Sequence, residues 1–279
     1  MKIENNKFIK KAIIIGASSD IGRALCDDWI GKNWEVTGTY RTNSDQVKAL
    51  SKNINETIHC DLLDSNSIDD ACSKLSKLGS KWDVLVLGPG LQEPVDLFHE
   101  SNFEEWEQSI KVNFTSQLRI LHRLLASRNS KCLTGPNVLF FAGGGVNNAP
   151  VNYSAYTVSK VALIKMVELL ASEIPDVKFL IIGPGWVKTK IHKSIINAGD
   201  RAGASYQKTI KTFLNNDFTP MSKVVECCNI LILGSRKILS GRNYSIAFDG
   251  WQDNNFEDFL QSDSNLYKLR RYGNNLKSK

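Results

Sequence analysis

Short apolar runs rich in β-branched residues alternate along this chain with longer stretches of helical periodicity. The runs have the length and composition of buried strands, and they are Ala12–Ile15, Glu35–Tyr40, Thr57–Cys60, Val84–Leu87, Asn137–Ala142, Lys178–Ile182 and Tyr244–Phe248. The stretches between them predict helices over Ile21–Gly31, Ser44–Lys52, Ser65–Leu78, Phe103–Arg128, Ser154–Glu173 and Ser222–Ser235. This alternation predicts an α/β domain with a doubly wound parallel sheet of about seven strands and helices on both faces. Such sheets bind ligands beyond the carboxyl ends of their strands.

The composition fits one domain and argues against several other classes of protein. With 279 residues and 42% apolar content, the chain can build one sizeable core. We expect no membrane span, because no apolar run approaches roughly 18 residues, and the polar N-terminus lacks the apolar segment of a signal peptide. Six cysteines without C-x-x-C spacing predict buried thiols in a cytoplasmic protein, and four scattered histidines suggest no metal site. A net charge of +6 is too modest for a nucleic-acid surface; an anionic small-molecule ligand or an ordinary solvated surface would explain it.

A glycine-rich turn follows the first predicted strand directly. The segment Gly16-Ala17-Ser18-Ser19-Asp20-Ile21-Gly22 leads from this strand into an amphipathic stretch. Glycine lets the backbone approach a pyrophosphate closely, and a helix N-terminus offers unpaired N–H groups and a positive dipole end. The turn therefore favours binding of a dinucleotide phosphate, although a purely structural turn would look similar.

Tyr156 and Lys160 stand four residues apart in the predicted helix Ser154–Glu173, so they share one helix face. A neighbouring cation favours the phenolate, and Tyr156 would then exchange a proton nearer neutral pH. Two ordinary helix residues would show the same spacing, so the pair gains weight only together with other motifs.

The other motifs also lie at predicted strand ends or in the helices that follow. Asp61 and Leu62 follow the third strand, and Gly183-Pro184-Gly185-Trp186-Val187-Lys188-Thr189 follows the sixth. Asn113 lies in Lys111-Val112-Asn113-Phe114, and Phe248-Asp249-Gly250 closes the pattern. Together, and in this order, these segments resemble the short-chain dehydrogenase/reductase family from about residue 8 to residue 251. The resemblance implies a single Rossmann-type domain.

The resemblance also implies roles for individual residues. Tyr156 would donate the proton in carbonyl reduction or accept it in alcohol oxidation, and Lys160 would contact the nicotinamide ribose and lower the Tyr156 pKa. Asn113 would hold a water linked to Lys160 or hydrogen-bond a break in its helix. Asp61 and Leu62 would line the adenine. The implied cofactor-binding residues are Gly16, Ser18, Ser19, Asp20, Ile21, Gly22, Arg41, Asp61, Leu62, Gly88, Gly90, Tyr156, Lys160, Pro184, Gly185, Val187 and Thr189.

Three departures from the family pattern bear on the cofactor. Asp20 replaces the central glycine of the turn, and we expect it to cap the following helix. Leu87-Gly88-Pro89-Gly90 replaces the usual Asn-Asn-Ala-Gly, which keeps the tight turn but loses the side-chain amides. The second strand ends at Tyr40 rather than at an acidic residue, and Arg41 follows. An arginine in this place favours a 2′-phosphate, and therefore NADP rather than NAD, unless Arg41 is only a solvated surface residue.

The fourth departure concerns the chemistry itself. The family's serine lies thirteen residues before the tyrosine, and this chain has Gly143 there, within Gly143-Gly144-Gly145-Val146-Asn147-Asn148. Backbone N–H groups of the glycines, Asn147 or Asn148, or a hydroxyl of the substrate could replace the serine hydroxyl. Alternatively, the chain binds a dinucleotide as a sensor or scaffold without turnover. Gly143, Gly144 and Asn147 are the expected substrate-side residues.

Two hypotheses follow for the function. The first is an NADP-dependent oxidoreductase that interconverts a carbonyl and a secondary alcohol. The loop at 143–150 and the tail at 267–271 resemble dehydrogenases of bacterial surface-polysaccharide pathways, so the substrate would be a sugar or nucleotide sugar. The second hypothesis is the dinucleotide-binding protein without turnover. Retention of Asn113, Tyr156, Lys160 and Thr189 favours the first.

The domain is expected to comprise residues 1–251, with a substrate-covering segment at 190–218 and a packed C-terminal extension at 252–279. We expect the extension to close over the substrate region and to bring Arg270 and Arg271 toward an anionic group, with residues from Gly273 onward fraying. The helices Phe103–Arg128 and Ser154–Glu173 are expected to pair with their own copies in a homodimer or homotetramer.

Overall fold

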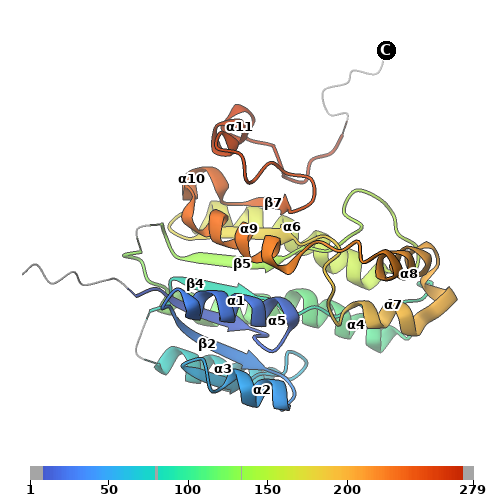
Figure 1. Ribbon diagram of the computed structural model, residues 1–279, viewed down its shortest axis with the longest axis horizontal. Helices are drawn as coiled ribbons and strands as arrows, with labels where there is room; N and C mark the ends of the chain where they lie inside the picture. The colour runs from blue at the N-terminus through green and yellow to red at the C-terminus, as the bar shows by residue number, and fades with distance from the viewer. Residues whose placement is uncertain (1–8, 79–80, 133, 273–279) are drawn as a thin grey trace, which may run out of the picture.

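All seven strands of the sheet run parallel, in the order β3-β2-β1-β4-β5-β6-β7. The computed structural model describes residues 9–78, 81–132 and 134–272. The strands are β1 (Lys11–Ile15), β2 (Glu35–Tyr40), β3 (Glu56–His59), β4 (Val84–Leu87), β5 (Asn137–Phe141), β6 (Lys178–Gly183) and β7 (Arg242–Ser245). The strand order reverses between β1 and β4, so the predicted doubly wound sheet is confirmed and its switch point lies where those two strands end (Figure 1).

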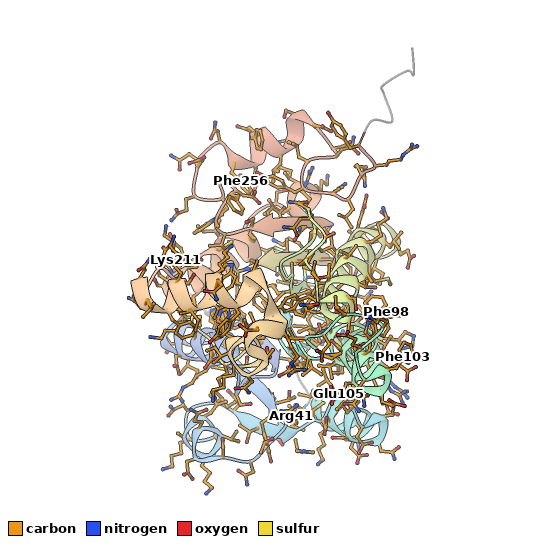
Figure 2. The ribbon with its side chains drawn as sticks, turned by 90° about the vertical axis from the view of Figure 1, so that its right-hand side faces the viewer. Arg41, Phe98, Phe103, Glu105, Lys211 and Phe256 are labelled. Carbon is orange, nitrogen blue, oxygen red and sulfur yellow. The ribbon has the colours of Figure 1, made fainter. Side chains whose placement is uncertain are left out.

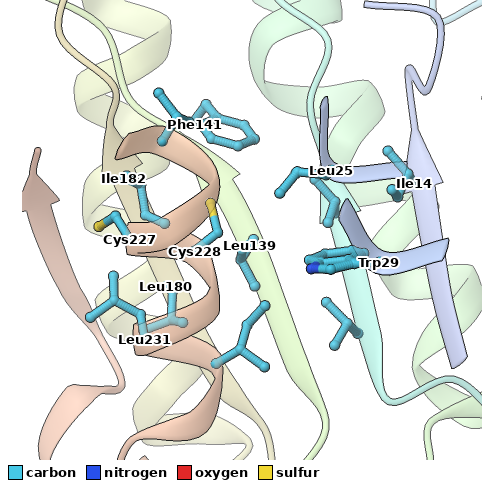
Figure 3. Close-up of a cluster of buried hydrophobic side chains, with 14 of the residues drawn as sticks. Ile14, Leu25, Trp29, Leu139, Phe141, Leu180, Ile182, Cys227, Cys228 and Leu231 are labelled. Carbon is cyan, nitrogen blue, oxygen red and sulfur yellow. The ribbon is translucent and has the colours of Figure 1, made fainter. Parts of the chain in front are cut away.

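Two helical layers cover the sheet, because both of its faces are apolar. Ile14 points into one core and Ile13 and Ile15 into the other, as the alternation of a strand requires. The first core packs under α1 (Asp20–Gly31), α9 (Met221–Leu233), α10 (Arg236–Leu239) and α11 (Phe256–Ser262). Figure 3 shows Leu25 and Trp29 of α1 and Cys227, Cys228 and Leu231 of α9 in this layer. The second core packs under α3 (Ser65–Lys77), α5 (Ser116–Leu124) and α6 (Ser154–Glu173).

The helix expected over Phe103–Arg128 is one helical stretch with changes of pitch. It comprises α4 (Phe103–Ile110), a π-helical turn (Lys111–Thr115), α5 and a 3₁₀ turn (Leu125–Ser127). Asn113 lies inside the π-helical turn and is fully buried. The remaining helices are α2 (Asp45–Leu50), α7 (His192–Ala198), a 3₁₀ turn (Gly199–Ala202) and α8 (Ala204–Asn215).

The C-terminal extension covers the outer edge of β7, which corrects its expected position. The Asn243 N–H donates to the Tyr267 carbonyl, and Arg242 donates to the carbonyls of Leu260 and Leu266. Arg270 forms a two-pronged ion pair with Glu168 at 2.6 and 3.0 Å. Glu168 lies twelve residues beyond Tyr156 on α6, about 18 Å along the helix axis. The extension therefore protects a sheet edge rather than closing over the substrate region. The expected fraying from Gly273 onward lies outside the described residues.

The last strand also ends earlier than the sequence pattern suggests. It was expected over Tyr244–Phe248, but β7 ends at Ser245 and Phe248 is 92% exposed. The chain turns there because the Asp249 carboxylate accepts from the Ser245 N–H at 2.7 Å, and the Trp251 indole donates to the Ile246 carbonyl. Among the residues described, no helix has the length and apolarity to cross a membrane.

Candidate active site

The glycine turn after β1 forms a cradle of backbone N–H groups. Gly16 has a φ of +79°, and a Cβ on Gly22 would lie 2.4 Å from the Gly16 carbonyl, so both positions require glycine. Within the described residues, the N–H groups of Ser18, Asp20 and Ile21 have no protein acceptor. They sit at the N-terminus of α1, where the helix dipole favours an anion. The turn therefore fits a dinucleotide pyrophosphate.

Asp20 does not cap α1, so this expectation is wrong. The Gly22 N–H donates to the Ser19 hydroxyl at 3.1 Å, which makes Ser19 the cap. The Asp20 carboxylate instead accepts from the Lys190 N–H at 2.7 Å, and the Lys190 ammonium donates to the Gln46 side chain at 2.7 Å. Asp20 therefore ties the chain that follows β6 to the phosphate turn. No local sequence signal identifies this contact, because Lys190 lies 170 residues away.

A hollow of about 330 Å³ lies beside the hydrogen bond between Asp20 and Lys190, between the phosphate turn and the segment after β6. Its lining is Asp20, Lys188, Thr189, Lys190, His192, Lys193, Ile196 and Phe213. A larger hollow of about 430 Å³ includes Glu168, Arg236 and Lys268, near the far end of α6. None of the strand-end motif residues lines the larger hollow, so the smaller one marks the candidate site.

The loop after β4 lies against the phosphate turn, and Asn113 holds it. A Cβ on Gly16 would lie 3.1 Å from the Pro89 ring, and the Gly88 N–H donates to the Ile15 carbonyl. The Asn113 Oδ1 accepts from the Leu91 N–H at 2.8 Å, and its Nδ2 donates to the Leu91 carbonyl at 2.7 Å. Asn113 thus joins the π-helical turn to the loop that carries Gly88 and Gly90.

Tyr156 and Lys160 lie on the face of α6 that meets the end of β5. The Lys160 ammonium donates to the Phe141 carbonyl at 2.8 Å and lies 5.8 Å from the centre of the Tyr156 ring. Burial lowers the pKa of Lys160 to about 8 and raises the pKa of Tyr156 to about 12. The expected lowering of the Tyr156 pKa is therefore not seen in this structure, because the loss of hydration on burial disfavours the phenolate. The phenol is protonated at neutral pH.

The glycine loop after β5 passes directly over Tyr156. A Cβ on Gly143 would lie 2.3 Å from the Tyr156 hydroxyl. Gly144 and Asn147 are exposed, and a Cβ on Gly144 would meet nothing within 4 Å. Of the expected substrate-side residues, Gly143 therefore borders Tyr156 and Gly144 borders open space. Among the described residues, Asn147 makes no hydrogen bond to the phenol.

The segments after β2, β3 and β6 complete this edge of the sheet. Arg41 directly follows β2 and is exposed; Figure 2, which faces this edge, labels it at the lower part of the molecule. Asp61 follows β3, and its carboxylate accepts from the Leu63 N–H at 2.9 Å, which fixes the turn at the buried Leu62. After β6, Gly185 has a φ of +74° beside Thr219, and Pro184 precedes it.

Aromatic side chains stabilise the chain that follows β6, and the sequence motifs did not identify them. The His192 ring stacks on Trp186 with centroids 5.1 Å apart, and it also contacts Phe213 and Phe218. The His192 Nε2 lies 2.8 Å from the carbonyl of Val187, which is buried. Burial lowers the pKa of His192, so its neutral form is favoured. These contacts position Val187 and Thr189 near the phosphate turn.

Comparisons with known proteins agree with this geometry. Residues 10–199 match the short chain dehydrogenase family model. The 3-oxoacyl-[acyl-carrier-protein] reductase FabG of Buchnera aphidicola subsp. Schizaphis graminum is 29% identical over 204 residues, which are 70% of this chain and 79% of that protein. The structure of the Saccharomyces cerevisiae YIR035C short chain dehydrogenase/reductase superposes with a TM-score of 0.76 at 24% identity, covering 90% of this chain and 99% of that one. The Pseudomonas aeruginosa RhlG/NADP complex gives a TM-score of 0.71 at 19% identity, covering 89% and 96%. This chain therefore belongs to the short-chain dehydrogenase/reductase family and is an NAD(P)-dependent oxidoreductase.

Proposed function

We propose that this protein interconverts a carbonyl and a secondary alcohol, with NADP as its cofactor and Tyr156 as the proton donor or acceptor. The observation that carries the proposal is the position of the Tyr156 hydroxyl at the carboxyl end of β5, directly under the loop at Gly143 and beside Lys160. Reduction of a carbonyl requires an acid, and a protonated phenol at the carboxyl ends of the strands, where such sheets bind ligands, can serve as that acid.

The residues that would hold NADP follow the ends of β1, β2, β3, β4 and β6. The turn from Gly16 to Gly22 would bind the pyrophosphate, and Asp61 and Leu62 would line the adenine. The segment from Pro184 to Thr189 would hold the carboxamide. When bound, NADP supplies or accepts the hydride, and the protein orients it and handles the proton.

Arg41 is the basis for NADP rather than NAD. It is exposed at the end of β2 and, in the part of the chain that the structure describes, it has no carboxylate partner. Its guanidinium is therefore available to pair with a 2′-phosphate in two-pronged geometry. The related RhlG was solved with NADP, which supports the same assignment here.

The hollow next to the phosphate turn combines lysine side chains with apolar surface from Ile196 and Phe213, which suits a substrate that has both a ring and polar or anionic groups. Lys188, Lys190 and Lys193 line the hollow next to the phosphate turn, and Lys208 lies 4.9 Å from the centre of the Trp186 ring. These cations favour a substrate rich in hydroxyls or carrying phosphate, such as a sugar or nucleotide sugar. The glycines at 143 and 144 leave room for a bulky ring.

We also propose a two-fold homo-oligomer, as a homodimer or as half of a homotetramer. On α6, Val158 and Leu169 are 52% and 44% exposed, although Leu163 and Val167 are buried. Next to α6, Phe103 stacks on Trp106, whose indole donates to Ser154 at the start of α6. An apolar face of this extent on two adjacent helices favours burial against a second copy.

A test of the function measures NADPH oxidation with a panel of ketones and keto-sugars. Tyr156→Phe should reduce kcat by roughly 10²–10⁴-fold while leaving NADPH affinity nearly unchanged, because the hydroxyl serves the proton and not the cofactor. Retention of more than about a tenth of the wild-type rate would assign the proton to another group. Tight NADPH binding without turnover of any substrate would favour the alternative function, a dinucleotide sensor or scaffold.

A further inference from the structure

The Tyr156 ring occupies the space that any side chain at position 143 would fill. A Cβ built on Gly143 would lie 2.3 Å from the Tyr156 hydroxyl oxygen, 2.5 Å from Cε1 and 2.6 Å from Cζ. These separations are far below the roughly 3.5–4.0 Å of an ordinary contact between carbon atoms. The φ of Gly143 does not lie in the positive range that favours glycine. The observed position of the ring, rather than the backbone conformation, therefore leaves no room for a side chain at 143 unless the ring moves.

The two glycines that follow have different surroundings. A Cβ on Gly144 would meet no atom within 4 Å, so alanine fits there. Gly145 has a φ of +93°, and a Cβ there would lie 2.9 Å from the Thr157 hydroxyl. Simple flexibility of a glycine run does not account for three such distinct environments. Only Gly143 borders the phenol.

The helix that carries Tyr156 is held close to the loop at Gly143. The Tyr156 ring extends from the start of α6, where the neighbouring Ala155 and Ser159 are each 1% exposed. Lys160, one turn further along, is bound to the Phe141 carbonyl two residues before Gly143. This bond joins α6 to the end of β5, so the helix and the loop cannot separate easily. A side chain at position 143 would have to displace the ring itself.

We propose that Gly143 is a positioning residue that makes room for the Tyr156 phenol, so that the serine typical of the family is sterically excluded here. Glycine at 143 and the observed placement of Tyr156 then form a matched pair. Introducing the serine would displace the proton donor and reduce activity. The proposal deepens the proposed function, on which its kinetic consequence rests.

The kinetic test compares Gly143→Ser and Gly143→Ala with the control Gly31→Ala, which lies outside the site, using NADPH and a ketone that the wild type reduces. We expect both variants at 143 to lose kcat by roughly 10–10²-fold, since misplacement of a reacting group by about 1 Å can cost that much. NADPH affinity should change less than about threefold, and Gly31→Ala should match the wild type, because Gly31 is exposed and a Cβ there would meet no atom within 4 Å. Wild-type or higher kcat in Gly143→Ser would overturn the proposal.

Thermal unfolding tests the contact independently of turnover. Gly143→Ser should lower Tm by about 2–8 °C when Tyr156 is present. In a Tyr156→Ala background the same substitution should cost almost nothing, because the ring is no longer in the way. An equal loss of Tm in both backgrounds would show that the ring and position 143 do not compete for space. If the wild type turns over no substrate yet this coupling is observed, the proposed function fails while the steric pairing stands.

Discussion

Replacement of Asn113 by alanine should destabilise the protein and loosen the loop after β4. The Asn113 side chain is fully buried and forms hydrogen bonds to the Leu91 N–H, the Leu91 carbonyl and the Ser109 hydroxyl, at 2.8, 2.7 and 3.2 Å. A net worth of about 0.5–1.5 kcal/mol for each bond gives a loss of about 2–4 kcal/mol. The Leu91 carbonyl keeps the Ser109 hydroxyl as a donor, which limits the cost.

Guanidinium unfolding, monitored by tryptophan fluorescence, measures this loss. NADPH affinity should also fall, because the tethered loop carries Pro89, which contacts the glycine turn at Gly16. Thr115→Ala is the matched control within the same π-helical turn: Thr115 is exposed and its 3.5 Å contact with the Lys111 carbonyl is weak, so we expect a change below about 0.5 kcal/mol. An unfolding free energy of Asn113→Ala within that same margin of the wild type would refute the reasoning.

Three further predictions concern charged residues. Arg41→Ala should weaken NADPH binding by about 1.5–3 kcal/mol and leave NADH binding nearly unchanged; titration of both cofactors checks this, and an equal loss for both would remove the case for a 2′-phosphate contact. Lys178→Met should cost about 3–5 kcal/mol in a denaturant titration, because the fully buried ammonium donates to the carbonyls of Leu231, Ile232 and Gly234 at the end of α9. Arg270→Ala should lower stability by about 0.5–1 kcal/mol above pH 4.5. Arg270 and Lys165 lower the Glu168 pKa from 4.5 to about 2. The difference in stability between wild type and variant, measured by thermal unfolding, should therefore vanish as the pH falls from 4.5 toward 2. A difference that does not depend on pH would assign the effect to packing.

The order of strands and helices could be predicted from the sequence because both faces of the sheet are buried. Each central strand is then an unbroken apolar run such as Val84–Leu87, and most runs end at a glycine or a polar turn. The last strand was misplaced because Phe248 continues the β-like pattern, although the side chain is exposed in the structure. Local pattern cannot show that Asp249 and Trp251 end the strand through their own hydrogen bonds.

The strand-end motifs could also be found from the sequence, but their partners could not. Asn113 reaches Leu91 across 22 residues, and Asp20 reaches Lys190 across 170. Neither contact leaves a periodic signal. The role of Asp20 was predicted wrongly because a capping residue and a residue that accepts from a distant segment look identical in sequence. The aromatic stack of Trp186 and His192 likewise depends on tertiary packing that no motif encodes.

The extension beyond β7 contacts β7 and α6. Its direction was predicted wrongly. The Tyr267 carbonyl accepts from the edge strand, and Arg270 pairs with Glu168, so the extension leads away from Tyr156. The unpaired edge of β7 and the Glu168 carboxylate on α6 therefore determine where the extension packs.

Glycines at this site indicate close contacts between segments rather than flexible loops. Gly22 admits the Gly16 carbonyl, Gly185 admits Thr219, and Gly143 admits the Tyr156 ring. Absence of the family's serine therefore does not by itself argue for lost activity, because the missing side chain is replaced by the phenol and not by empty space. The decision between an active enzyme and a dinucleotide-binding protein depends on whether the phenol in this position can reach a bound carbonyl. Lys160 and Asn113 fix the backbone near the phenol, at Phe141 and Leu91, and the proposed proton transfer requires the phenol hydroxyl to keep its place relative to a bound carbonyl.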